Sequence, residues 1–390
     1  MHICFVSYWG LREGLTQATV LPHLQILADR KDVHLISFVT VERKGKVEPL
    51  AMEKVQHHVL STSEAVAKKL FDKGKARKHL GEIHGNNPVD LVIARSSLAG
   101  WLVLDFTRVQ GIPLAVESFE PHADYMLESG VWKKLDPRFV MAKAAEKRLK
   151  QQADWLLPVT RRYADQLVEE EDVDPAKVLV MPCCVDPDRF AFSAADRLRI
   201  RKDLGIPAKN TVGIYTGKLG GIYLEKEAME LFHSAHDYWH KKFHMIILSP
   251  DEEKWRQLLE SSGFKQTDVS VQYVPMKDVP AYLSAADLAF SLHRPSPSKI
   301  GISPIKNAEY FANGLPVMIP EGIGDDTHMV EKWNLGVSFT MDEIGRQAMF
   351  NRVAPMVDQR TTSKRISDWA AKSRSFAIVK EHYQTILSGL

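Results

Sequence analysis

Two successive series of short apolar runs, most of them followed by a helical pattern, constrain the fold of this chain most strongly. The second series begins after a charged helical segment at residues 193–204 and repeats the pattern of the first. Short strands that alternate with helices are typical of βαβ units and a parallel sheet. The expected strands are HICFVS, VHLISFV, DLVIAR, PLAVES, WLLPVT and VLVMP, followed by TVGIYTG, FHMIILS, VSVQYV, DLAFSL, PVMIP and GVSF.

These two series predict two doubly wound α/β domains, because 390 residues exceed what one hydrophobic core usually sustains. We expect the first domain at residues 1–187 and the second at 188–371, connected near residues 184–192. The remaining segment, at about 372–390, is helical and follows the last strand of the second sheet. From the pattern alone, this helix could cover either domain.

The overall charge and the cysteines limit the class of protein. The 51 basic and 49 acidic residues leave a net charge of +2, so nothing global indicates a nucleic-acid partner. Of three cysteines, Cys183 and Cys184 are neighbours and poorly placed for an ordinary disulfide. No run approaches the ~20 apolar residues of a membrane span, and the N-terminal run lacks the basic flank of a signal peptide. We expect a cytoplasmic protein that is at most peripheral to a membrane.

Residues 303–316, SPIKNAEYFANGLP, form the most informative segment. We expect Ser303 to be the N-cap of a helix and Pro304 to be its first helical residue. Lys306 would be the third helical residue, where a cation opposes the helix dipole by ~0.3–1 kcal/mol unless an anion lies nearby. A bound phosphate would remove that conflict, and Glu309 could accept hydrogen bonds from sugar hydroxyls. The alternative is an ordinary amphipathic helix with a solvated lysine and glutamate.

Glycine-containing loops follow the first strand of each predicted sheet. Gly10 and Gly14 would let the backbone approach a ligand, although their spacing is not that of a dinucleotide fingerprint and the loop could be a plain turn. No acidic residue is expected at the end of the second strand, which argues against a dehydrogenase. Lys218 lies in the second loop, where it could clamp a phosphate or be a surface lysine in a turn.

Polar residues at other strand ends suggest an acceptor side. Glu117 lies near the end of the expected strand PLAVES, and Glu120 and His122 follow it. A carboxylate or imidazole there could polarise a reacting hydroxyl, although His122 could be an exposed loop histidine. Arg95 could meet a negative group of the acceptor or form an ion pair. The basic run at residues 65–80 could rest on anionic lipid at about 1 kcal/mol per charge, or it could be a solvated face. The histidines are scattered without metal-ligand spacing, so we expect no metal.

Several segments resemble one enzyme family. SPIKNAEYFANGLPVMI resembles the donor-site motif of family-four retaining glycosyltransferases, in which Ser-Pro-x-Lys-x-x-Glu-Tyr-x-Ala-x-Gly-x-Pro-Val recurs. TGKLGG is similar to the family's diphosphate-binding loop, VMPCCVDPDRF to its inter-domain segment, YLSAADLAFSL to the stretch before the donor helix, and GLTQATVLPHLQILA to its first helix. The resemblance covers nearly the whole chain. It implies the GT-B fold, with two facing Rossmann-like domains and a C-terminal helix that packs back on the first, acceptor-binding domain.

The resemblance also implies roles for individual residues. Glu309 would hold the donor ribose, and Lys218 and Lys306 would hold the diphosphate. Two family residues are missing, because Gly301 stands at the position of a second glutamate and Tyr223 at that of a second basic residue. The remaining donor-binding positions implied by the motifs are Gly217, Val274 and the backbone around Ser303, Pro304 and Ile305.

The function implied is retaining transfer of a sugar from a UDP- or GDP-linked donor to a hydroxyl of a glycan or lipid-linked acceptor, in polysaccharide or glycolipid assembly. Glu117 or His122 would lie nearest the reaction, and neither metal nor other cofactor would be needed. The alternatives are a non-catalytic GT-B subunit that binds a partner or glycan, and a sugar-nucleotide epimerase. Product analysis without an acceptor would separate the epimerase from the transferase.

Overall fold

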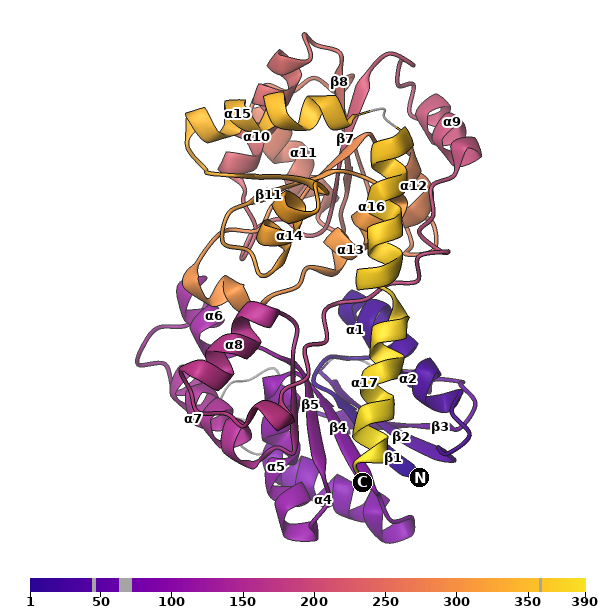
Figure 1. The fold of residues 1–390 in the computed structure, drawn as a ribbon, viewed down its shortest axis with the longest axis vertical. Coiled ribbons are helices and arrows are strands. Elements are labelled where there is room, and N and C mark those ends of the chain that lie inside the picture. The colour runs from indigo at the N-terminus through magenta and orange to yellow at the C-terminus, as the bar shows by residue number, and fades with distance from the viewer. Residues whose placement is uncertain (44–46, 63–71, 358–359) are drawn as a thin grey trace. The chain divides into compact units, whose positions relative to one another are not determined.

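The computed structural model describes residues 1–43, 47–62, 72–357 and 360–390 (Figure 1). The chain divides into two compact units. Unit 1 comprises Met1–Pro182 and Ala377–Leu390, and unit 2 comprises Cys183–Phe376. The first unit therefore ends after Pro182 rather than after residue 187, and the chain returns to it at Ala377 rather than at residue 372.

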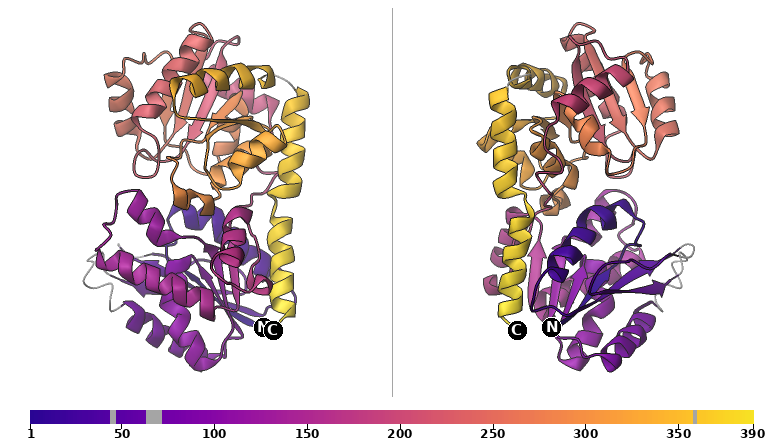
Figure 2. Two further views of the ribbon diagram at one scale, coloured as in Figure 1. Left: turned by 60° about the vertical axis from the view of Figure 1, so that its left-hand side comes forward. Right: turned by 90° about the vertical axis from the view of Figure 1, so that its right-hand side faces the viewer.

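Each unit is built on a six-stranded sheet whose paired strands are parallel. The strand orders are β3-β2-β1-β4-β5-β6 in unit 1 and β12-β11-β10-β7-β8-β9 in unit 2. Each order places the first strand of its unit beside the fourth, which is the doubly wound Rossmann arrangement. Helices cover both faces of each sheet (Figure 2). The predicted fold class is confirmed.

The elements of unit 1 alternate between strand and helix along most of its length. Its strands are β1 (His2–Ser7), β2 (Leu35–Glu42), β3 (Val55–Ser61), β4 (Leu91–Arg95), β5 (Leu114–Phe119) and β6 (Trp155–Pro158). Its helices are α1 (Gly14–Thr19), α2 (Leu21–Ala28), α4 (Asp72–Asn86), α5 (Ser97–Gln110), α6 (His122–Glu128), α7 (Pro137–Gln152), α8 (Arg161–Glu169), η1 (Pro175–Lys177) and α17 (Phe376–Ser388).

Unit 2 repeats the alternation. Its strands are β7 (Thr211–Thr216), β8 (Phe243–Leu248), β9 (Val269–Gln272), β10 (Leu288–Phe290), β11 (Val317–Pro320) and β12 (Gly336–Phe339). Its helices are α9 (Ala194–Asp203), α10 (Lys226–Tyr238), α11 (Glu252–Ser261), α12 (Val279–Ala285), η2 (Pro297–Gly301), α13 (Ile305–Asn313), α14 (Asp326–Lys332), α15 (Glu343–Val353), η3 (Ala354–Met356) and α16 (Arg360–Ser373).

In unit 1 one predicted strand is wrong and one strand was not predicted. The run VLVMP is not a strand, since it contacts β6 only through the N–H groups of Leu179 and Met181 and an isolated bridge at Val178. The sheet instead takes β3 as its edge, in parallel register with β2. Most side chains of β3 are exposed or half-buried, so it lacks the continuous apolar run that marks a strand buried on both faces.

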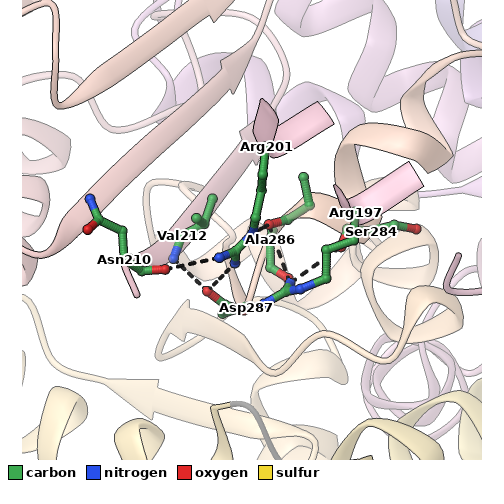
Figure 3. Close-up of polar contacts among 8 residues, drawn as sticks. Arg197, Arg201, Asn210, Val212, Ser284, Ala286 and Asp287 are labelled. Atoms are coloured by element: carbon green, nitrogen blue, oxygen red, sulfur yellow. Dashed lines mark hydrogen bonds and ion pairs between the residues drawn. The ribbon is translucent and has the colours of Figure 1, made fainter. Parts of the chain in front are cut away.

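A buried carboxylate joins the first helix of unit 2 to its sheet (Figure 3). Asp287 Oδ2 accepts hydrogen bonds from the Val212 N–H and from Arg201 Nη2, each at 2.7 Å. Arg197 pairs with the other oxygen, Oδ1, and donates through Nη1 to the Ala286 carbonyl at 2.8 Å. Two arginines of α9 and the start of β7 therefore meet at one side chain that precedes β10. This arrangement fixes the first helix of the unit against the central strands.

A second buried carboxylate attaches the C-terminal helix to unit 1. Glu117, at the end of β5, is paired with Arg95 Nη1 at 3.0 Å and His23 Nδ1 at 3.3 Å. The Tyr383 hydroxyl of α17 donates to its other oxygen, Oε1. Burial alone would raise the pKa of Glu117, but His23, Arg95 and Tyr383 lower this pKa to about 2. Helix α17 is thereby held beside α2, which carries His23 (Figures 1 and 2).

Replacing Asp287 by Asn should destabilise unit 2 by ~3–5 kcal/mol, because the change removes the buried negative charge with which both Arg197 and Arg201 form ion pairs. Asp196→Asn is the matched control, because this carboxylate pairs with Arg199 at the surface and an exposed pair contributes at most ~1 kcal/mol. Urea unfolding followed by circular dichroism measures both variants. Equal midpoints for the two variants would contradict the role given to Asp287.

Replacing Glu117 by Gln should destabilise unit 1 and loosen α17, with Glu381→Gln on the exposed face of the same helix as the control. A carboxyl whose pKa is lowered on folding stabilises the protein above its unfolded pKa of about 4.5. This contribution is lost as the pH falls from about 4.5 towards 2, so the wild type should lose stability in that range and the Glu117 variant should lose less. Hydrogen exchange of the α17 amides at neutral pH should be faster in Glu117→Gln alone. Unchanged exchange would show that Glu117 does not hold the helix.

Candidate functional site

The donor helix predicted from the sequence is α13, but it starts one residue later than expected. Pro304 is its N-cap, so Lys306 is the second helical residue rather than the third. The prediction of Ser303 as the cap is wrong, because its Oγ accepts hydrogen bonds from the Cys183 N–H at 3.3 Å and from Arg374 Nη1 at 3.2 Å. Lys306 still lies in the first turn, where a cation opposes the helix dipole.

Lys306 is a buried cation between two aromatic rings. The residue is only 7% exposed, and its Nζ is 4.2 Å from the ring centroid of Tyr223 and 4.5 Å from that of Tyr215. Among the described residues no carboxylate forms an ion pair with it, and its hydrogen bond to the Tyr215 hydroxyl is long, at 3.4 Å. Burial lowers the pKa of Lys306 to about 7, against the opposing effect of Glu309. A desolvated titratable group with a strongly shifted pKa is typical of a functional site.

Gly217 makes room for this lysine. It follows β7 with φ of 145°, a conformation that side chains rarely adopt. A Cβ atom at this position would lie 2.4 Å from Lys306 Nζ and 2.9 Å from the Tyr215 hydroxyl. Any larger residue would therefore displace the ammonium group, so the glycine of the loop TGKLGG is explained by its close approach to Lys306.

Glu309 is more enclosed than the sequence predicted. It is 5% exposed, and its carboxylate has no hydrogen bond to the described residues. Burial raises the pKa of Glu309 to about 7, although Lys306 and Arg189 act in the opposite direction. Its neighbour Tyr310 has a structural role, since its hydroxyl accepts the Thr216 N–H at 2.8 Å and ties α13 to the end of β7. Glu309 is therefore a carboxyl with free hydrogen-bonding capacity one turn from the buried cation.

Two further residues of this region were not predicted. His293 and Lys299 are both buried in the segment between β10 and α13. Burial, followed by the nearby cations Lys306 and Lys299, holds the pKa of His293 well below its usual value. The ring of Tyr223 lies 4.9 Å from that of His293 and 4.2 Å from Lys306 Nζ, so this tyrosine contacts both the imidazole and the buried ammonium group. A polar run after a strand, SLHRPSPSK, was the sequence pattern that could have identified them.

The other predicted donor residues lie in loops of the same unit. Lys218 is exposed after β7, and its carbonyl accepts the Tyr215 hydroxyl at 2.8 Å. Val274 is half-buried in the loop after β9, and Ile305 is half-buried at the start of α13. Arg189 is exposed and donates to the carbonyl of Met276, in the loop that also holds Val274. Lys306, Gly217 and Glu309 are thus close to one another, whereas Lys218 and Val274 are on the surrounding loops.

In unit 1, the structure separates the predicted catalytic residues. Glu117 and Arg95 are buried in the network that holds α17, and this geometry favours a structural role for both. His122 is half-buried at the start of α6, with Nδ1 3.5 Å from Glu120 Oε1 and its ring 5.6 Å from that of Trp132. His122 also lines a cavity of 840 Å³. Of the residues predicted to lie near the acceptor, His122 is therefore placed at a cavity of unit 1.

An acidic residue at the end of β2, which the sequence analysis did not predict, binds the backbone of the glycine loop after β1. Strand β2 continues to Glu42, because its register with β3 extends to the pair Glu42 and Ser61. Glu42 Oε1 accepts the Leu11 N–H at 2.7 Å, and a Cβ atom on Gly10 would lie 2.3 Å from Oε2. Gly14 begins α1, and no atom would crowd a Cβ there. Gly10 is therefore required by packing against Glu42, whose carboxylate is already bound to the loop.

Two general features of the described residues bear on partners. No three histidine, cysteine, aspartate or glutamate side chains among them come together as ligands for a metal ion. None of the helices in that part of the chain combines the length and the apolar character needed to cross a bilayer.

The sequence matches no protein-family model and no curated protein. Solved structures, in contrast, match along the whole chain. Sucrose-phosphate synthase from Thermosynechococcus elongatus has a TM-score of 0.76 at 15% identity, with 100% of both chains covered. WaaG, a glycosyltransferase involved in lipopolysaccharide biosynthesis, gives 0.74 at 15% identity, again with 100% of both chains covered. Anabaena HepE in complex with UDP-glucose gives 0.71 at 14% identity and the same coverage.

The TM-scores over the full length of the chain establish the fold. Sequence identities of 14–15% do not establish the activity, which must be argued from the site. The strand order of each unit and the return of the chain to unit 1 at Ala377 agree with this likeness over the full length. The chain has the GT-B fold of these glycosyltransferases.

Proposed function

We propose that this chain is a retaining glycosyltransferase of the family-four type, which moves a sugar from a nucleoside-diphosphate donor to an acceptor hydroxyl. The observation that carries the proposal is Lys306, a buried cation in the first turn of α13 without an ion pair among the described residues. A bound diphosphate would neutralise this cation and receive hydrogen bonds from the free N–H groups of the same turn. Anabaena HepE binds UDP and UDP-glucose, so a UDP-sugar is the first donor to test and a GDP-sugar the second.

The chemistry of this proposal is charge stabilisation. Negative charge develops on the leaving diphosphate as its bond to the sugar breaks, and a fixed cation stabilises that charge most effectively where water is excluded. Lys306 supplies the fixed cation, Lys218 can add a second from its exposed loop, and Glu309 would accept hydrogen bonds from the donor ribose. The acceptor oxygen bonds to the anomeric carbon on the face that the diphosphate leaves, and the leaving phosphate takes the acceptor proton, so no nucleophile of the protein is required. The fixed cations would supply the charge stabilisation for which other enzymes use a divalent metal.

We further propose that the enzyme acts in cell-surface polysaccharide or glycolipid assembly and contacts the anionic surface of a membrane from the cytoplasm. Helix α4 carries Lys75 and Arg77 as exposed cations, whereas the exposed Lys78 lies 4.0 Å from Glu82 and Lys73 is paired with Asp105 at 2.6 Å. Each exposed cation near an anionic surface contributes about 1 kcal/mol. The rest of the basic run, at residues 65–71, lies outside the described residues.

Replacing Lys306 by Met should lower the kcat/KM of nucleoside-diphosphate release about 10²–10³-fold, because the developing charge loses its buried partner. The variant should melt at the same or a higher temperature without ligand, since an apolar side chain is easier to bury than a cation. Lys364→Met, on the exposed face of α16, is the control and should keep wild-type turnover. Undiminished release by Lys306→Met would refute the proposal.

The affinity for a UDP-sugar should also depend on pH. Burial holds the pKa of Lys306 at about 7 in the free protein, and a bound diphosphate would raise it, so binding takes up a proton above about pH 7 and weakens as the pH rises. Glu309, whose pKa is also about 7, ionises in the same range. Calorimetric titration of Glu309→Gln between about pH 6 and 9 isolates the lysine. The decline should persist in this variant and vanish when Lys306→Met is added; a decline in the double variant would assign it to another group.

A further inference from the structure

The cavity of unit 1 is not used by the donor site, whose residues all belong to unit 2. It has a volume of 840 Å³ and opens beyond the carboxyl ends of β1 and β4, where parallel sheets usually bind ligands. Pockets of about 300–1,000 Å³ enclose most of a small organic ligand. The cavity is therefore large enough for more than the single hydroxyl that a transfer reaction requires.

Its walls are mainly apolar. Trp9, Trp101 and Trp132 supply aromatic faces, and Met126 and Met141 supply flexible apolar surface. A pocket for a bare sugar would need a polar partner for most hydroxyls, because an unpaired buried hydroxyl costs ~1–3 kcal/mol. These walls fit a ligand whose larger part is hydrocarbon.

Helix α7 forms one wall of the cavity and contributes Arg138 near its start and a buried carboxyl further along. Ala142 and Ala145 are buried at the wall, where longer side chains would fill the space. Glu146, next in sequence, also lines the cavity and is only 2% exposed. Its Oε1 accepts the Ala123 N–H at 2.8 Å, and Oε2 has no hydrogen bond to any described residue. One oxygen of a buried carboxyl is thus free to bind a hydroxyl of the ligand.

We propose that this cavity binds an amphiphilic acceptor, with the hydrocarbon part against the tryptophan and methionine walls and a hydroxyl of its polar head on Glu146 Oε2. The inference rests on the proposed transferase function and names the class of acceptor, an alkyl or aryl compound with a hydroxylated head. Glu146 is a binding residue in this account, and its free oxygen explains why a carboxyl is kept in an apolar wall.

The probe is octyl β-D-glucoside below its critical micelle concentration. Its binding is followed by tryptophan fluorescence, because three tryptophans line the cavity. Octyl glucoside should bind saturably and at least about tenfold more tightly than two reference compounds. These are glucose, which has no hydrocarbon tail, and per-O-methylated octyl glucoside, which has the same tail and no hydroxyl. Phenyl β-D-glucoside distinguishes an aryl from an alkyl preference. Absence of saturation, or equal binding of the methylated compound, would overturn the proposal.

Variants of α7 locate the binding. Ala145→Leu should weaken octyl glucoside binding at least about tenfold by filling the cavity, whereas Ala144→Leu, on the exposed face of the same helix, should not. Glu146→Gln retains an acceptor for the Ala123 N–H and should lose most of the preference for the hydroxylated over the methylated probe. Equal affinities in all three variants would place the binding elsewhere.

Thermal stabilisation by a UDP-sugar, measured on the same preparations, separates the two proposals. Loss of glucoside binding with stabilisation by the UDP-sugar intact would refute the acceptor inference alone. Glucoside binding without any effect of UDP- or GDP-sugars would refute the proposed function and leave an amphiphile-binding site.

Discussion

The burial of one positive charge against the direction of a helix dipole is the constraint on which the donor region depends. Lys306 is surrounded by two tyrosine rings, a glycine without a side chain and a carboxyl that makes no ion pair with it. Each of these features has a cost that the folded chain alone does not recover, since the ammonium group is desolvated and opposes the dipole. In the proposed function, a bound diphosphate would offset both costs. The unfavourable free energy of burying Lys306 without an anion would then be recovered as affinity for the donor.

Four buried carboxyl groups, two in each unit, differ in how completely they are paired. Asp287 and Glu117 each meet arginine or other donors and connect helices to their sheets. Glu309 and Glu146 are as deeply buried but have no ion pair among the described residues, and burial raises the pKa of each to about 7. Complete pairing indicates a structural role, because each lone pair already has a donor. Glu309 and Glu146 retain hydrogen-bonding capacity, and the proposed donor and acceptor sites each use one of these two carboxyls.

The sequence predicted the fold well because most strands of both sheets are buried on both faces and appear as continuous apolar runs. It failed at β3, an edge strand with half-exposed side chains. The positions of Lys306 and Glu309 follow from local spacing along one helix. The partners of Ser303 and Glu117 do not, because Arg374 and Tyr383 come from distant parts of the chain. A pattern can show that a polar residue ends a strand, but it cannot show whether another segment has already satisfied that residue.

The most direct measurement is a crystal structure of the protein with a UDP-sugar. The account predicts a diphosphate oxygen within hydrogen-bonding distance of Lys306 Nζ, with the N–H groups at the start of α13 directed at the same phosphate. A nucleotide bound elsewhere, with Lys306 still enclosed between Tyr215 and Tyr223, would contradict it.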